Sequence, residues 1–308
     1  MTGISIIFVK IKGLRIIDIS ESAVYSLMSY RGYTMLNKTL ILCCLVFVAG
    51  PLQAQSTDIP RLAEGLPNIS GIWQSLNNAN WNLEAQVSQQ GPLESLGAIG
   101  AVPPGQSVIR GGQIPYKASA LDQRSQNYAA RRTEDPEAKC FMPGIPRANY
   151  MPQPFQIFQT DTDIMMVYQF AGAVRTVYMD NHINAPLDGW MGWSNGHWEE
   201  DTLVIEVSGL NPNWLDRAGN FYTSAAKITE RYTLLTPYHL NYEVTVEDPD
   251  VYEEPWTISM PLYRRVEESA RLFDFKCVEF AEEIMYSHLT RENYFRDLGI
   301  DISGDSDE

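Results

Sequence analysis

A glutamate in an apolar stretch is the first candidate for chemistry. Glu230 shares one face of a predicted strand with Ile228 and Tyr232, because alternate residues of a strand point the same way. If that face is buried, the carboxylate points into the core, where its pKa is raised unless it is paired, and this suits a general acid or base. The alternative is an ion pair with Arg175 or Arg217 that only stabilises the core.

An arginine in a second apolar stretch is the matching candidate. Arg175 shares a face with Val177 and Met179, whereas Tyr178 lies on the opposite face. A buried guanidinium is costly unless it is paired, so we expect Arg175 to point inward and to pair with Glu230, or to orient an anionic ligand there.

A loop at residues 214–220 carries a polar pair beside Trp214 and Gly219. Asp216 and Arg217 would contact a substrate at the mouth of a barrel, with Asp216 as an acid or base, because loops on a rigid scaffold often carry function. In the alternative, the Asp216 carboxylate caps the backbone of its own turn.

Two histidines flank an aromatic segment. His182 and His197 lie on either side of Trp190 and Trp193, so a histidine could act as an acid or base beside an aromatic wall. Such a wall suits a sugar ring or a flat apolar ligand. Alternatively, both histidines are solvent-facing loop residues.

Composition and missing motifs exclude several classes of protein. The chain has 308 residues, 44% of them hydrophobic, which is enough for a packed core, and its formal net charge of −15 argues against nucleic-acid binding. The hydrolase elbow, phosphate-binding loop, dinucleotide fingerprint, zinc-protease helix and EF-hand loop are absent from the sequence. We therefore expect no cofactor and no metal.

The N-terminal region predicts export. Residues 35–54 contain Lys38, an apolar run and a small-residue exit at Ala54, which is the order of a secretory signal peptide. A short membrane anchor is the alternative. If residues 35–54 are a signal peptide, residues 1–34 would be a start-site artefact. The mature chain would begin at Gln55, without stable membrane insertion, in the periplasm or outside the cell.

Two cysteines follow the predicted signal peptide. Cys140 and Cys277 form an even pair, so a disulfide in an oxidising compartment is expected, with two buried free thiols as the alternative. Neither has the nearby His or Cys residues that a zinc site would need. Arg147, close to Cys140, would bind an anionic group or fix the loop that carries this cysteine.

The order of elements predicts a mainly β protein. Residues 55–143 are loop-rich, with one helix at 121–132, and form a wrap around a core at 144–290. Alternation with period two indicates short strands, which antiparallel pairing would close into a single β-barrel or closed sandwich. A short C-terminal helix and an acidic tail occupy 291–308. The expected strands are 155–159, 164–170, 174–179, 203–207, 227–235, 240–246, 256–262 and 272–278.

Several blocks resemble a known group. Gly71-Ile-Trp is similar to the Gly-x-Trp motif of the first lipocalin strand, so the barrel is expected to be lipocalin-like. Longer blocks resemble a large family of exported bacterial proteins of unknown function, over nearly the whole mature chain. They are Pro67-Asn-Ile-Ser-Gly-Ile-Trp-Gln, Cys140-Phe-Met-Pro-Gly-Ile-Pro-Arg, Pro154-Phe-Gln-Ile-Phe-Gln-Thr, the run from Trp190-Met-Gly-Trp to Leu203-Val, Trp214-Leu-Asp-Arg-Ala-Gly-Asn, Ile228-Thr-Glu-Arg-Tyr and Glu247-Asp-Pro.

The chain departs from that family at two of three histidine positions and at one glycine. The resemblance implies His near His182, at Trp193 and near Tyr222, and three such residues would suggest a metal site. Only His182 is present, so a three-histidine metal site is not expected here. The family's glycine is also replaced by Glu200, at a predicted hairpin turn.

Three functions fit these observations. The first is a cofactor-independent acid–base enzyme, such as a lyase, hydratase, isomerase or hydrolase, acting on a sugar or apolar small molecule. The second is a carrier that encloses an apolar or amphipathic ligand in the barrel. The third is an envelope module whose acidic face and N-terminal wrap dock another protein.

Overall fold

The computed structural model describes residues 7–10, 13–16, 58–91, 94–160, 162–289 and 291–300. The chain forms two compact units, Met1–Ser56 and Thr57–Glu308. In the first unit, β1 (Ile7–Lys10) pairs antiparallel with β2 (Gly13–Ile16). The predicted signal peptide at 35–54 lies outside the described residues, as do residues 301–308 of the predicted acidic tail.

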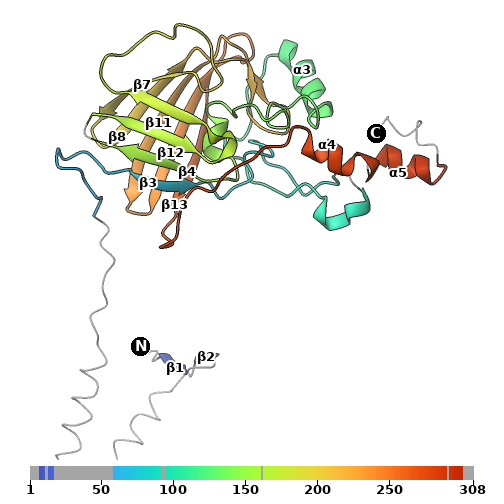
Figure 1. Ribbon diagram of the computed structural model, residues 1–308, viewed down its shortest axis with the longest axis horizontal. Coiled ribbons are helices and arrows are strands. Elements are labelled where there is room, and N and C mark those ends of the chain that lie inside the picture. The colour runs from blue at the N-terminus through green and yellow to red at the C-terminus, as the bar shows by residue number, and fades with distance from the viewer. Residues whose placement is uncertain are drawn as a thin grey trace, which may run out of the picture. The chain divides into compact units, whose positions relative to one another are not determined.

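The second unit is built on a closed barrel of nine strands, so the predicted mainly β class and single barrel are confirmed. Its strand order is β11-β12-β13-β3-β4-β5-β6-β7-β8, and each pairing is antiparallel except that of β6 with β7. A two-stranded pair, β9 (Asn213–Trp214) and β10 (Phe221–Tyr222), flanks the loop of Asp216. The barrel strands (Figure 1) are β3 (Gly71–Gln74), β4 (Phe155–Gln159), β5 (Ile164–Tyr168), β6 (Val174–Tyr178), β7 (Trp193–Glu199), β8 (Thr202–Ser208), β11 (Lys227–Thr236), β12 (His239–Glu247) and β13 (Trp256–Arg264).

Alternating burial explains why these segments form strands. Along β12, Leu240, Tyr242, Val244 and Val246 are fully buried while the residues between them are not. Each such side chain contributes roughly 1.5–3 kcal/mol by leaving water. A one-residue slip would move this whole set to the solvent, so the pairing register, which places Glu230 opposite Val244, is strongly specified.

The N-terminal segment does more than wrap the core. Within 55–143, β3 closes the barrel between β13 and β4, and Trp73 on this strand is fully buried. The Trp73 indole donates to the Ile69 carbonyl at 2.9 Å, and the Arg264 guanidinium lies 4.4 Å from its ring centroid. The barrel therefore includes a strand that precedes the predicted core at 144–290.

The prediction of a strand at 272–278 is wrong. These residues form extended chain without strand pairing, although Phe275 and Cys277 are partly buried while Phe273 is exposed. Both edges of β13 are already paired, and a closed barrel leaves no edge for another strand. The alternation instead reflects one side of the segment packing on the domain, where Phe275 contacts Phe170 with ring centroids 4.9 Å apart.

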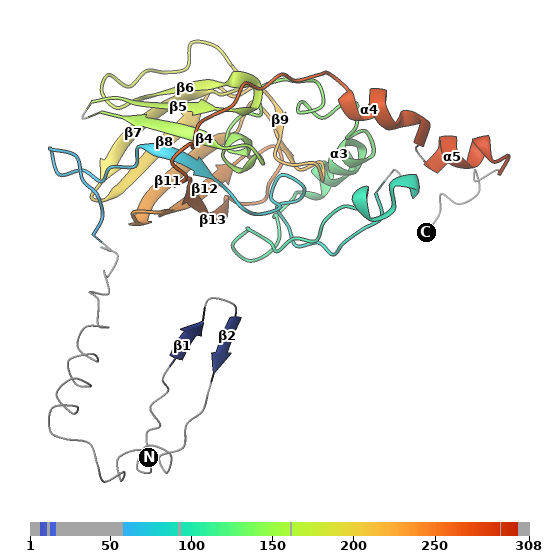
Figure 2. The ribbon, with the colours of Figure 1, turned by 60° about the horizontal axis from the view of Figure 1, so that its bottom comes forward.

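The α-helices gather at one end of the barrel, as both views show (Figure 1, Figure 2). The helix predicted at 121–132 is α3, three residues earlier, and a short C-terminal helix is present as predicted. None of the helices in the described ranges is long and apolar enough to cross a bilayer. The α-helices are α3 (Ala118–Ala129), α4 (Ala281–Tyr286) and α5 (Arg291–Asp297), and the 3-10 helices are η1 (Glu94–Ile99), η2 (Arg147–Tyr150), η3 (Phe170–Gly172) and η4 (Ser287–Leu289).

Candidate functional site

The barrel interior holds the predicted ion pair. Arg175 on β6 and Glu230 on β11 are both buried, and a guanidinium nitrogen of Arg175 donates to Glu230 Oε2. Arg175 Nε donates to Ser194 Oγ at 2.7 Å. The inward direction of both side chains and their pairing are thus confirmed. For Glu230, the structure contains the ion pair that was predicted as the alternative to a catalytic role.

The second oxygen of Glu230 is also occupied. Glu230 Oε1 accepts from Asn149 Nδ2 at 2.9 Å, Tyr232 Oη at 2.9 Å and Tyr242 Oη at 2.7 Å. Burial, followed by the charge of Glu230, raises the pKa of both tyrosines well above its usual value, so they remain donors. Burial likewise raises the pKa of Tyr168, which donates to Asn149 Oδ1 at 3.1 Å, to about 12. Through its hydrogen bond to Asn149, the Glu230 carboxylate holds η2 against the barrel interior.

Asp216 is fully buried and caps its own turn. Its Oδ1 accepts from the backbone N–H groups of Ala218 at 2.9 Å and Asn220 at 3.2 Å. Its Oδ2 accepts from the Leu83 N–H at 2.9 Å and Asn220 Nδ2 at 2.6 Å. Burial raises the pKa of Asp216 to about 6, although the donors from Asn220 and Leu83 act to lower it. This geometry matches the alternative prediction, in which the Asp216 carboxylate caps the backbone of its own turn.

Arg147 fixes the segment that carries Cys140. Its guanidinium is buried and binds Asp135 through both carboxylate oxygens at 2.7 and 3.0 Å, Glu137 at 2.7 Å and Asn80 at 2.8 Å. Burial alone would raise the pKa of Glu137, but the charges of Arg147 and Arg217 outweigh it and lower that pKa to about 2. Arg147 therefore plays the loop-fixing role that was one of its two predicted roles.

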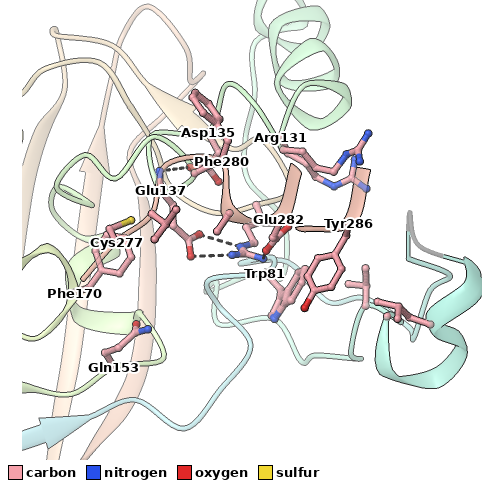
Figure 3. Close-up of a pocket in the computed structure, with 18 of the residues that line it drawn as sticks. Trp81, Arg131, Asp135, Glu137, Gln153, Phe170, Cys277, Phe280, Glu282 and Tyr286 are labelled. Atoms are coloured by element: carbon pink, nitrogen blue, oxygen red, sulfur yellow. Dashed lines mark hydrogen bonds and ion pairs between the residues drawn. The ribbon is translucent and has the colours of Figure 1, made fainter. Parts of the chain in front are cut away.

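Arg217 extends this network toward solvent. It binds Glu137 through two nitrogens at 2.9 and 3.0 Å and Glu282 at 3.0 Å. Its guanidinium carbon lies 4.7 Å from the ring centroid of Trp81. Arg217, Glu137 and Trp81 all line a cavity outside the barrel (Figure 3).

This cavity has a volume of about 530 Å³ and a mixed lining. Its walls come from four parts of the chain that lie far apart in sequence: the N-terminal segment, the strand-flanking residues Gln153 and Phe170, Arg217 in the loop between β9 and β10, and the C-terminal segment. None of the described residues that line it belongs to a barrel strand. The aromatic lining residues are Trp81, Phe170, Phe275, Phe280 and Tyr286, and the charged ones are Arg131, Arg132, Asp135, Glu137, Arg217, Lys276 and Glu282.

The predicted disulfide is confirmed and forms part of this region. Cys140 and Cys277 are bonded, with their Cα atoms 5.6 Å apart and a sequence separation of 137. Cys277 lines the cavity, and neighbouring Val278 and Phe280 line it too. The bond thus ties the C-terminal wall to the segment held by Arg147.

A second cavity, of about 570 Å³, adjoins the first. The two share Trp81, Val102, Arg131 and Arg217 in their linings. The remaining wall is mostly polar and includes residues of α3. It consists of Asn82, Gln86, Gln89, Leu121, Arg124, Ser125, Tyr128 and Ala218.

The histidines and tryptophans predicted for a site lie elsewhere. His182 is exposed, with Nε2 2.9 Å from the Gly196 carbonyl, and His197 Nε2 lies 3.3 Å from Glu199 Oε1. Neither residue lines either of the two cavities just described.

The two tryptophans have different environments. Trp190 packs against Phe141, with ring centroids 4.9 Å apart, next to the disulfide. Trp193 stacks on Tyr178 at 6.2 Å and lines a recess of about 130 Å³ together with Arg175. The structure therefore does not gather His182, His197, Trp190 and Trp193 around one cavity among the residues it describes.

Within the described ranges, no three His, Cys, Asp or Glu side chains are grouped as metal ligands. No protein-family model matches the chain, and a search of curated proteins finds no match. The resemblance to exported bacterial proteins accordingly stays a prediction.

Most residues of the cavity have no signature in the sequence. Trp81 lies in the loop-rich segment, and Phe275 lies in a stretch that alternation assigned to a strand. The available signal was a concentration of aromatic and cationic residues in segments without regular structure. No sequence pattern indicated Asn149, which links η2 to the barrel network.

Proposed function

We propose that the protein binds a small molecule in the cavity beside the barrel. The observation that carries this proposal is the cavity itself, whose volume of about 530 Å³ falls within the range of ligand sites and whose lining combines aromatic rings with a few charged groups. The proposal is a form of the carrier hypothesis, with the ligand outside the barrel rather than within it.

The burial of both candidate carboxylates favours a binding function over acid–base catalysis by them. Glu230 and Asp216 are fully buried, and their oxygens accept hydrogen bonds from neighbouring residues of the fold. A general acid or base must reach its substrate directly or through one water. Acid–base catalysis at these carboxylates stays a prediction without geometric support.

The disulfide supports the proposed location. A bond between Cys140 and Cys277 suits an exported protein, because thiols are kept reduced in the cytosol. We place the binding function in the periplasm or outside the cell.

Native mass spectrometry of protein purified from its own cells tests the binding function, compared before and after denaturation. We expect a retained small molecule at close to one per chain. The fluorescent probe 8-anilinonaphthalene-1-sulfonate should also bind the emptied protein at one site, since it has an aromatic body that this lining can accept.

A pair of variants locates the site. Ala281→Trp places an indole in the cavity lining and should abolish probe binding, whereas Ala225→Trp adds the same ring at an exposed position away from both cavities. Equal probe binding by both variants, or by neither variant nor wild type, would contradict the proposal. Thermal unfolding of each variant verifies that it is folded.

A further inference from the structure

The two cavities adjoin and differ in character. The 530 Å³ cavity has an apolar part formed by Leu96, Ile99, Phe170, Phe275 and Phe280, which we call the apolar half. Most residues that line the 570 Å³ cavity carry amides, hydroxyls or guanidinium groups, with Val102, Leu121 and Ala218 as apolar exceptions, and we call it the polar half. Trp81, Arg131 and Arg217 belong to both linings, so the halves meet at these side chains.

The polar half has an unusual charge for this protein. Arg124, Arg131 and Arg217 line it, and no Asp or Glu is among the described residues of its wall. The chain as a whole has a formal net charge of −15. A cationic recess in an acidic protein favours anionic over cationic ligands at short range, because nearby charges dominate once salt screens distant ones.

Two of these arginines already have carboxylate partners. Arg217 binds Glu137 and Glu282, and Arg124 binds Glu84 at 2.6 Å. Their charges are largely balanced within the fold, so they shape the recess more than they attract a ligand.

Arg131 differs from both. It belongs to none of the ion pairs found in the described part of the chain. Its guanidinium is positioned all the same: its carbon lies 4.2 Å from the ring centroid of Tyr128, and Nη1 donates to the Tyr128 carbonyl at 2.8 Å. A guanidinium has five N–H donors, and its planar fork matches a carboxylate.

We propose that the adjoining cavities bind an amphipathic carboxylate, with its apolar body in the apolar half and its carboxylate on Arg131. This inference rests on the proposed binding function and specifies its ligand class. Trp81, at the junction, contacts the ligand where the body meets the head group. The ligand is bound without any covalent step.

Calorimetric titration of the full chain with three ten-carbon probes tests the ligand class. Decanoate, decanol and decylammonium share a body and differ in the charge of the head group. We expect decanoate to bind at least tenfold more tightly than decanol, and decylammonium to bind more weakly than either.

Variants assign the preference to one residue. Arg131→Gln should reduce decanoate affinity at least tenfold and leave decanol affinity unchanged, which also shows that the variant is folded. Arg110→Gln is the matched control, because Arg110 is an exposed arginine outside both cavities. If Arg131→Gln does not fold, Arg131→Lys should retain part of the preference for decanoate over decanol.

The outcomes distinguish a failure of the carboxylate inference from a failure of the proposed binding function. If decanol and decanoate bind wild type equally, or if Arg131→Gln leaves the preference intact, the carboxylate inference is wrong while the binding function stands. If no probe binds and purified protein retains no molecule, the proposed function fails and the inference fails with it.

Discussion

Backbone geometry at single residues has measurable consequences. Glu200 lies in the turn between β7 and β8 with φ of 53°, a left-handed conformation that a residue with a Cβ adopts at a cost. This is the position where the resemblance implied glycine. The residue has an exposed side chain, so no burial offsets that cost.

Glu200→Gly should therefore stabilise the protein. We expect the free energy of unfolding to rise by about 0.5–1 kcal/mol, because glycine adopts the left-handed region without strain. Denaturant unfolding monitored by tryptophan fluorescence measures the change. Glu254→Gly, at an exposed position without positive φ, is the control and should not stabilise. A loss of stability in Glu200→Gly would refute the strain argument.

The carboxylate of Glu137 links pH to stability. Its pKa, lowered from 4.5 to about 2 in the folded state, means that the unfolded chain takes up its proton first as the pH falls. The stabilisation is complete above pH 4.5 and disappears as the pH falls toward about 2. Asp216, with its pKa raised to about 6, changes stability in the opposite direction, so a difference between variant and wild type isolates Glu137.

Glu137→Gln should lower the free energy of unfolding at pH 7 by roughly 3 kcal/mol, since the shift corresponds to that order of magnitude and two arginines lose a partner. The deficit should shrink steadily below pH 4.5. Urea unfolding at a series of pH values measures it. Glu134→Gln, which removes an exposed partner of Lys139, should change stability by less than about 0.5 kcal/mol. A deficit that is independent of pH would argue against this assignment.

At the scale of elements, one covalent bond holds a segment that has no strand pairing. After β13 ends at Arg264, the chain runs as extended backbone and short helices to residue 289, with few buried side chains. This segment nevertheless supplies a wall of the proposed site through Phe275, Cys277 and Phe280. Its position depends on the disulfide, on Phe170 and on ion pairs such as Arg217 with Glu282.

Replacing both cysteines, in Cys140→Ser with Cys277→Ser, should release this wall. We expect a loss of roughly 2–5 kcal/mol in the free energy of unfolding, because the bond closes a loop across 137 positions. Hydrogen exchange of the folded variant should increase across residues 265–289 and stay unchanged in β11 and β12. Binding of 8-anilinonaphthalene-1-sulfonate should weaken in parallel.

The single variant Cys140→Ser is the control, because it also cannot form the bond. It should show the same exchange pattern as the double variant. Unchanged exchange in residues 265–289 would mean that packing alone holds the wall in place.

At the scale of the whole molecule, sequence patterns predicted the scaffold far better than the site. Alternation in stretches such as Leu240–Val246 reports burial on one face of a strand, so the barrel followed from local pattern. The pairing of Arg175 with Glu230 followed from parity and the cost of an isolated buried charge. Alternation and parity each relate residues along one strand, which is why they can be read from the sequence.

The proposed site could not be predicted in this way. Trp81, Arg131 and Phe275 lie in three separate loop segments, and nothing periodic relates them. The short β3 was indicated only by the resemblance of Gly71-Ile-Trp to a first lipocalin strand and not by periodicity, because four residues in a loop-rich stretch show too little alternation. The false strand at 272–278 arose because an extended segment packed on one side has the same period as a strand.

The distribution of the cavity walls along the chain has a consequence for synthesis. Trp81 and Arg131 precede most of the barrel strands in the sequence, whereas Phe275, Phe280 and Tyr286 follow β13 and are synthesised after every barrel strand. The barrel can close as soon as β13 reaches β3, but the site is complete only when the segment after β13 has been made and the disulfide has formed. A product that terminates after β13 would retain every barrel strand and lack a wall of the site, so ligand binding reports that the segment after β13 is present and that its cysteine is oxidised.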